Sequence, residues 1–224
     1  NKKEIKVNIK IKNIIKNFLN NIFIRLRSQN DAFIAKTYLP FFEEKKLELS
    51  INYLPSFYEN LVINYKPINK EIRKKLVLNT SSKISVKNFI KKNMHLFMPK
   101  AYLENFNELI VLAKSKYFPQ NPKFIFTSEL YAYDEVFKVY AANQIKKKSL
   151  FIGQHGNNYF TQIHCNYSNE TIYAHKFLSW GHEKKKETKN LIGLFNFKTL
   201  NIDTKKEKNK KEKIIIVLNS PRNI

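Results

Sequence analysis

The residues best suited to chemistry are gathered in one stretch, LFIGQHGNNYFTQIHCNYSNETIYAHKFLSWGHE, at positions 150–183. The four glycines of the chain, four of its five histidines, its single Trp and its single Cys lie in this stretch or just after it. A chain so poor in glycine is expected to keep it where φ is positive or where the backbone closely approaches a ligand. We therefore look for the functional centre here.

Within this stretch, the turn at 153–158 presents a histidine between glycines. Gly153 and Gly156 flank His155, and Asn157 and Asn158 tolerate the left-handed backbone conformation. Backbone N–H groups in such a turn can form a nest for an anion. An imidazole here can act as a general base near neutral pH or donate to a phosphate. His155 is therefore the first catalytic candidate.

Other polar residues compete with His155 or support it. Glu129 and Asp134 follow an earlier apolar run and are alternative bases. Three amide side chains next to the histidine are expected to position the hydroxyl groups of a substrate: Gln154, Asn157 and Asn158.

Several well-known kinds of site are excluded. Steps of 9, 11 and 7 residues separate His155, His164, His175 and His182, and this spacing fits no zinc-ligand motif. The chain contains neither a phosphate-binding P-loop motif nor a G-x-S-x-G nucleophile motif. We expect no metal site and no bound cofactor.

The elements that must position these residues alternate between strand and helix. Apolar runs predict strands at 123–127, 149–152, 176–179 and 191–195, with a helix over 131–146 between the first two. Such alternation favours a parallel sheet with helices on its faces. Ligands of open α/β sheets bind at the carboxyl ends of the strands, where His155 and Glu129 would both lie.

The first half of the chain is expected to be more helical. Strands are predicted at 32–39 and 76–78, and helices at 11–26, 41–49, 82–93 and 99–116. The helix at 11–26 is amphipathic, with Lys and Asn opposite its apolar side. It could pack on a core or lie on a membrane surface.

The composition and net charge bear on which partners the protein can bind. The 224 residues carry a formal net charge of +23, which favours anionic partners unless it reflects a general enrichment in lysine. The lysines are dispersed and no nucleic-acid-binding motif is present, so we expect no specific nucleic acid. One Cys points to a reducing compartment, and no apolar run is long enough to span a membrane. A non-catalytic basic module that binds nucleic acid or an anionic membrane remains an alternative.

The end of the chain suggests a domain boundary. Residues 203–213, DTKKEKNKKEK, read as a charged linker. The apolar run at 214–218 then resembles a buried parallel strand. We expect one α/β domain over 1–202, and the first strand of a truncated second domain at 214–224.

Three segments resemble a known family, the bacterial surface-carbohydrate transferases. The first is FIGQHGNNY at 151–159, followed by Glu170 and by FLSWG at 177–181. The second is MPKAYLE at 98–104 with Phe106. The third is AFI at 32–34 with TYL at 37–39, followed by Glu44 and Leu47.

This resemblance implies the N-terminal, Rossmann-like part of a GT-B-type glycosyltransferase with helical elaborations. It implies a nucleotide-sugar donor, a glycan or lipid-linked acceptor, and work in the cytoplasm, peripherally at the inner face of the membrane. It adds four residues to the expected substrate contacts: Gly156, Tyr159, Glu170 and Trp180. The fragment alone is expected to be inactive, and a sugar-nucleotide epimerase of similar fold remains a further alternative.

Overall fold

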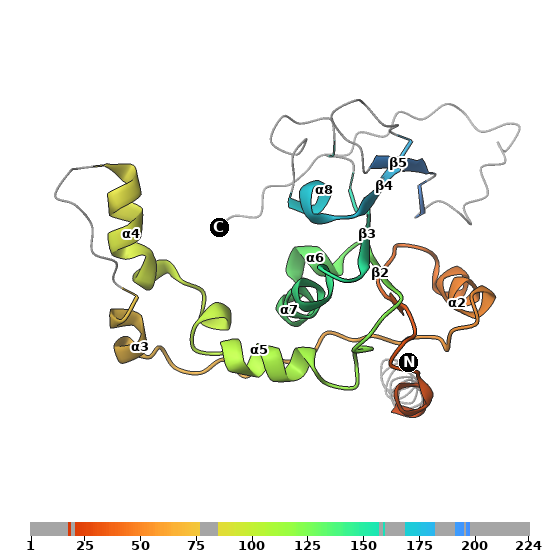
Figure 1. Cartoon of the computed structure of the whole chain (residues 1–224), viewed down its shortest axis with the longest axis horizontal. Helices are drawn as coiled ribbons and strands as arrows, with labels where there is room; N and C mark the ends of the chain where they lie inside the picture. The colour runs from red at the N-terminus through yellow and green to blue at the C-terminus, as the bar shows by residue number, and fades with distance from the viewer. Residues whose placement is uncertain are drawn as a thin grey trace, which may run out of the picture.

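The structure, a computed structural model, describes residue 18 and residues 21–76, 85–156, 159, 169–181, 191–194, 196 and 197. In these ranges five strands form one sheet: β1 (Phe33–Ile34), β2 (Phe124–Thr127), β3 (Ser149–Gly153), β4 (Lys176–Trp180) and β5 (Leu191–Leu194). Their order in the sheet equals their order in the chain, and all neighbouring pairs are parallel (Figure 1). The predicted parallel α/β class is confirmed.

Helices connect and flank these strands. In chain order they are a helix at residues 21–26, α2 (Phe41–Ser50), α3 (Lys70–Lys74), α4 (Val86–Phe97), the 3-10 helix η1 (Lys100–Tyr102), α5 (Phe106–Ala113), α6 (Leu130–Tyr133), α7 (Glu135–Gln144) and α8 (Asn169–Tyr173). No helix in the described ranges is long and apolar enough to cross a membrane.

Four predicted elements differ from the structure. The helix expected at 82–93 is α4, which begins at Val86 after an N-cap at Ser85 and continues to Phe97. The expected helix at 131–146 is divided at Asp134, whose side chain caps α7 by accepting a hydrogen bond from the Phe137 N–H at 2.8 Å. The expected helix at 99–116 is divided into η1 and α5. The strand expected at 32–39 ends at Ile34, because Lys36 and Tyr38 have φ angles of 54° and 64°.

Some predictions cannot be compared with the structure. The strand expected at 76–78 falls mainly outside the described residues, as do the charged linker, the run at 214–218, and most of the helix at 11–26.

The sheet buries side chains on both faces. Phe33, Ile125 and Ile152 point to the face covered by α5 and α7, where they join the larger apolar core. Ile34 and Phe126 point to the other face, on the side of α2. Figure 1 shows α6, α7 and α8 on one side of the sheet and α2 on the other. Two-sided burial explains why the strands read as continuous apolar runs rather than alternating ones.

A buried polar network attaches α2 to the sheet. The Lys45 ammonium lies 2.8 Å from the Glu48 carboxylate, and the Glu48 side chain is 1% exposed. Ser56 donates through its backbone N–H to Glu48 and through its hydroxyl to the Ile34 carbonyl. This network connects α2, the segment after it and the end of β1.

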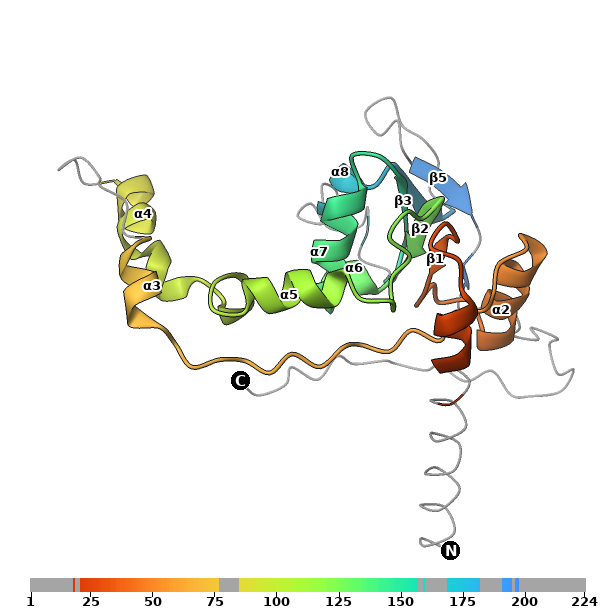
Figure 2. The same ribbon diagram turned by 60° about the horizontal axis from the view of Figure 1, so that its bottom comes forward.

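Helices α3 and α4 lie together at the end of an arm, far from the sheet in both views (Figures 1 and 2). The extended segment at 53–69 runs out to the arm, and η1 and α5 return from it. The fully buried Asn105 joins the two, because its side chain accepts from the Lys66 N–H at 3.0 Å and donates to the Asn64 carbonyl at 2.9 Å.

Candidate functional site

The turn that holds His155 follows β3 directly, at the carboxyl edge of the sheet, as predicted. Gly153 ends the strand at a point of close approach: a Cβ there would lie 2.2 Å from Ser128 Oγ, which follows β2. The same Ser128 hydroxyl donates to the Thr37 carbonyl at 2.9 Å, just beyond β1. Glycine at this position therefore lets three strand ends pack together.

The other glycines of the site differ from one another. Gly181, after β4, has a φ of 82°, which only glycine adopts without strain. Gly156 shows neither feature: its φ is not in the left-handed region, and an added Cβ would meet no atom of the described residues within 4 Å. The expected positive φ is confirmed at Gly181, and Gly153 is required by its close approach to Ser128. Approach of a ligand to the backbone at Gly156 remains a prediction.

Gln154 ties this turn to the neighbouring strand. Its side-chain oxygen accepts from the Trp180 N–H at 2.8 Å, and its amide nitrogen donates to the Gly156 carbonyl at 2.7 Å. The residue is 3% exposed. Gln154 therefore positions the turn, and contact of Gln154 or Trp180 with a substrate remains a prediction.

His155 is paired with a carboxylate from α8. His155 Nε2 lies 3.2 Å from Glu170 Oε1, and the Tyr159 hydroxyl donates to the other Glu170 oxygen. The Tyr159 ring also meets the His155 ring edge to face, with centroids 5.2 Å apart. The Glu170 side chain is 10% exposed and that of His155 32%, so the imidazole is the more accessible member of the pair.

This arrangement can move a proton. Because an ionised carboxylate only accepts, the His155–Glu170 hydrogen bond places the proton of a neutral imidazole on Nε2 and its lone pair on Nδ1. The same carboxylate stabilises the imidazolium that forms when the ring takes up a proton. Tyr159 holds the carboxylate in place on its far side. Such a group fits general acid–base catalysis.

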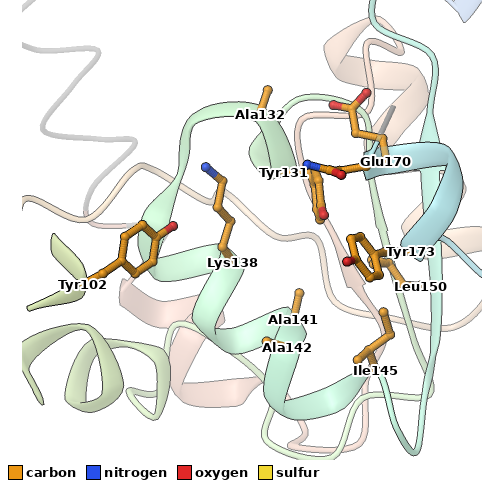
Figure 3. Close-up of a pocket in the computed structure, with 11 residues that line it drawn as sticks. Tyr102, Tyr131, Ala132, Lys138, Ala141, Ala142, Ile145, Leu150, Glu170 and Tyr173 are labelled. Atoms are coloured by element: carbon orange, nitrogen blue, oxygen red, sulfur yellow. The ribbon is translucent and has the colours of Figure 1, made fainter. Parts of the chain in front are cut away.

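A hollow of about 710 Å³ lies beside Glu170, between α7 and α8 (Figure 3). Figure 3 shows Lys138 and Tyr102 across this hollow from Tyr173 and Glu170. Apolar side chains from α7, from the residue that follows it and from β3 form its floor: Ala141, Ala142, Ile145 and Leu150. We call this hollow the tyrosine groove. Its volume suits a small-molecule ligand.

The polar side of the tyrosine groove is already organised. Lys138 Nζ lies 2.8 Å from Glu135 Oε1, and the Tyr102 hydroxyl donates to the same carboxylate. Burial, followed by this hydrogen bond, raises the pKa of Tyr102 above its usual value. Sequence reasoning did not find the groove, because its walls come from segments that no spacing rule connects.

Glu129 lies in a different hollow, of about 260 Å³, at the ends of β1 and β2. It accepts from the Tyr38 hydroxyl at 2.9 Å and from the Tyr133 hydroxyl at 3.2 Å. Burial, with the bond to Glu129 as the next cause, raises the pKa of Tyr38 to about 12. Lys36 and Thr37 also line this hollow. The backbone here has positive φ at Lys36 and Tyr38.

Asp134 has a clear structural role. One of its oxygens caps α7, and the other accepts from the Tyr58 hydroxyl at 2.8 Å. The residue is only 5% exposed. Catalytic roles for Asp134 and Glu129 remain predictions, and the structure gives each of them partners other than His155.

Two predicted substrate contacts and two of the remaining histidines of the stretch cannot be located. Asn157, Asn158, His164 and His182 lie outside the described residues. His175 lies at the opposite edge of the sheet, just before β4, where its Nδ1 accepts from the Leu150 N–H at 3.0 Å. Within the described ranges, no group of three or more His, Cys, Asp or Glu side chains could hold a metal ion.

Comparison with protein families identifies the chain. A model of the LIC12162 family of transferases matches residues 1–223. The chain therefore belongs to this transferase family. No curated protein and no solved structure matches it.

Proposed function

We propose that this member of the LIC12162 transferase family transfers a sugar from a nucleotide-activated donor to a glycan or lipid-linked acceptor of the cell surface. The single observation that carries the proposal is the His155–Glu170 pair at the carboxyl edge of a parallel sheet. Glycosyl transfer needs a base close to the acceptor hydroxyl, and an oriented imidazole fits that role.

In this proposal His155 takes the proton of the attacking hydroxyl as the new glycosidic bond forms and the nucleotide leaves. Glu170 orients the ring and stabilises its charged form. The His155 side chain is 32% exposed, which leaves the imidazole accessible to a substrate. Asn157 and Asn158 would contact donor or acceptor hydroxyl groups.

The tyrosine groove is the proposed place for the sugar part of one substrate. Tyr131 and Tyr173 offer rings and hydroxyl groups, and Glu170 connects the groove to His155. Aromatic rings that carry a polar group suit ligands with both apolar and hydroxylated surfaces. The nucleotide is proposed to bind mainly to a second, GT-B-type domain that begins near residue 214, with the reaction at the cytoplasmic face of the membrane.

Membership of a transferase family favours this proposal over a non-catalytic basic module and over an epimerase. The test is incorporation of label from a panel of radiolabelled nucleotide sugars into membranes of a source strain that lacks the gene. Addition of the full-length protein should label a glycan or lipid with one of the donors. Absence of transfer from every donor, or recovery of an isomerised nucleotide sugar, would contradict the proposal.

A further inference from the structure

Helix α4 has an apolar side that no described residue covers. None of its residues is buried, and five large apolar side chains are between 56% and 77% exposed: Val86, Phe89, Ile90, Leu96 and Phe97. With 3.6 residues per turn, Val86, Ile90 and Phe97 form a central stripe, and Phe89 and Leu96 adjoin it on one side. A hollow of about 300 Å³, lined by Phe89, Ile90, Asn93, Met94, Phe97 and Met98, follows this stripe.

Positive charge borders the stripe on both sides. Lys87 and Lys91 adjoin it on one side and Lys92 on the other. No acidic residue occurs between Ser85 and Lys100. A helix with bulky apolar residues on one side and lysines along the border has the character of a helix that lies in the plane of a membrane interface.

Because of its position in the molecule, α4 is accessible to a flat surface. It lies at the end of the arm, away from the sheet in both views (Figures 1 and 2). The buried Arg73 of α3 fixes it there by donating to the His95 and Met98 carbonyls at 2.8 and 3.0 Å and to Glu104 at 2.7 Å. The apolar stripe is therefore held in place, and its exposure is not a consequence of a loose attachment.

We propose that α4 docks the protein on an anionic lipid surface. The stripe around Phe89 and Phe97 enters the headgroup region, while Lys87, Lys91 and Lys92 contact lipid phosphates. Lysines on both borders complement an extended negative plane, which is the reason for choosing a bilayer rather than a protein as the occupant. The inference depends on the arm alone and is independent of the chemistry proposed for His155.

The first test is flotation of the purified protein with vesicles. Binding is expected with an equal mixture of phosphatidylcholine and phosphatidylglycerol, and little binding with phosphatidylcholine alone. A variant with Lys87→Gln, Lys91→Gln and Lys92→Gln should bind about a hundredfold more weakly, since each lysine near an anionic surface contributes roughly a factor of five. Removal of the same charge at Lys146, Lys147 and Lys148, on the turn before β3, is the matched control and should have a much smaller effect.

If the two triple variants lost vesicle affinity equally, the proposal would be overturned, because binding would then depend on net charge alone. Failure of the wild type to bind the anionic vesicles would do so as well. The substitutions should leave the thermal midpoint unchanged, since α4 has no buried side chain.

A second test follows insertion directly. Phe97→Trp should show a blue shift of fluorescence on adding the anionic vesicles, whereas Phe42→Trp, on the exposed side of α2, should show none. Phe89→Ser with Phe97→Ser should weaken vesicle binding by roughly tenfold for each phenylalanine. If these two substitutions instead dissolve a dimer seen by light scattering and leave vesicle binding intact, the stripe is an interface between two copies and the proposal is wrong.

Discussion

At the scale of single residues, Gly153 and Gly156 flank the same histidine but meet different constraints. A Cβ at Gly153 would clash with Ser128 Oγ at 2.2 Å, whereas a Cβ at Gly156 would meet no atom of the described part of the chain within 4 Å. Gly153→Ala is therefore expected to destabilise the protein by about 1–3 kcal/mol, because overpacking forces the buried Ser128 to move. Gly156→Ala should change stability by no more than about 0.5 kcal/mol.

The measurement for this pair is the free energy of unfolding from urea denaturation. Equal stability of the two variants would show that Ser128 can shift without cost and that the packing of the three strand ends is not restrictive. In the proposed function, Gly156→Val should lower the rate of transfer, because it adds bulk at the residue next to the proposed base.

His155 and Glu170 also show what a sequence can and cannot predict. The glycines and the strand before His155 are local features, and they placed the imidazole correctly at the edge of the sheet. The pairing with Glu170 depends on how α8 returns toward β4, which no local pattern specifies. The resemblance points to Glu170 as a substrate contact, which remains a prediction, and the structure adds that Glu170 is paired with His155.

At the scale of elements, the ion pair between Arg73 and Glu104 should make the arm sensitive to acid. Hydrogen bonds from Arg73 are the main cause that lowers the pKa of Glu104, from 4.5 to about 2. A carboxyl group whose pKa falls on folding stabilises the folded state above its unfolded pKa, and this contribution is lost as the pH falls toward the folded value. The contribution should therefore be complete above about pH 5 and absent near pH 2.

Thermal unfolding of the wild type and of Glu104→Gln at several pH values tests this prediction. The two midpoints should differ at neutral pH and converge as the pH approaches 2. Glu71→Gln is the control, because the Glu71–Lys74 pair is exposed and contributes little. If the difference in thermal midpoint between wild type and Glu104→Gln did not change with pH, the charge of Glu104 would not contribute to stability.

Helix α2 offers a second matched pair of substitutions. Glu48→Ala removes one of the two carboxylates that contact Lys45 and leaves the buried Ser56 N–H without its acceptor, which should cost about 1–3 kcal/mol of stability. Glu43→Ala removes an ion pair of the same spacing with the exposed Lys46 and should cost less than about 1 kcal/mol. Denaturant unfolding gives the loss of folding free energy for each variant. Similar losses would show that burial of the Lys45 network adds nothing to stability.

The same elements explain the errors in the predicted helices. Apolar residues at helical spacing continue through 131–146 and 99–116, so periodicity alone predicts a single helix in each range. Asp134 prefers to cap α7 and to accept from Tyr58, and Asn105 is used to bind the extended segment at 64–66. These tertiary contacts override the local preference for a continuous helix. The sequence does not reveal which residues Asp134 and Asn105 contact.

At the scale of the whole molecule, the parallel sheet was predictable and the arm was not. Strands that are buried on both faces leave apolar runs that any reading of the sequence detects. The spacing of apolar residues in α4 is amphipathic, but only the structure shows that this helix lies on the arm with its large apolar side chains exposed. The tyrosine groove likewise exists only because α7 and α8 lie on the same side of the sheet.

The central claim is that His155 and Glu170 act as one catalytic unit, and a double-mutant cycle on the rate of sugar transfer tests it most directly. His155→Ala should lower the rate by about 10²–10⁴, and Glu170→Gln should lower it substantially as well. The double variant should be no slower than the slower single variant, because groups that act together are not additive. His175→Gln, at the other edge of the sheet, should keep the rate. A His155→Ala variant that is correctly folded and transfers sugar at the wild-type rate would contradict the account.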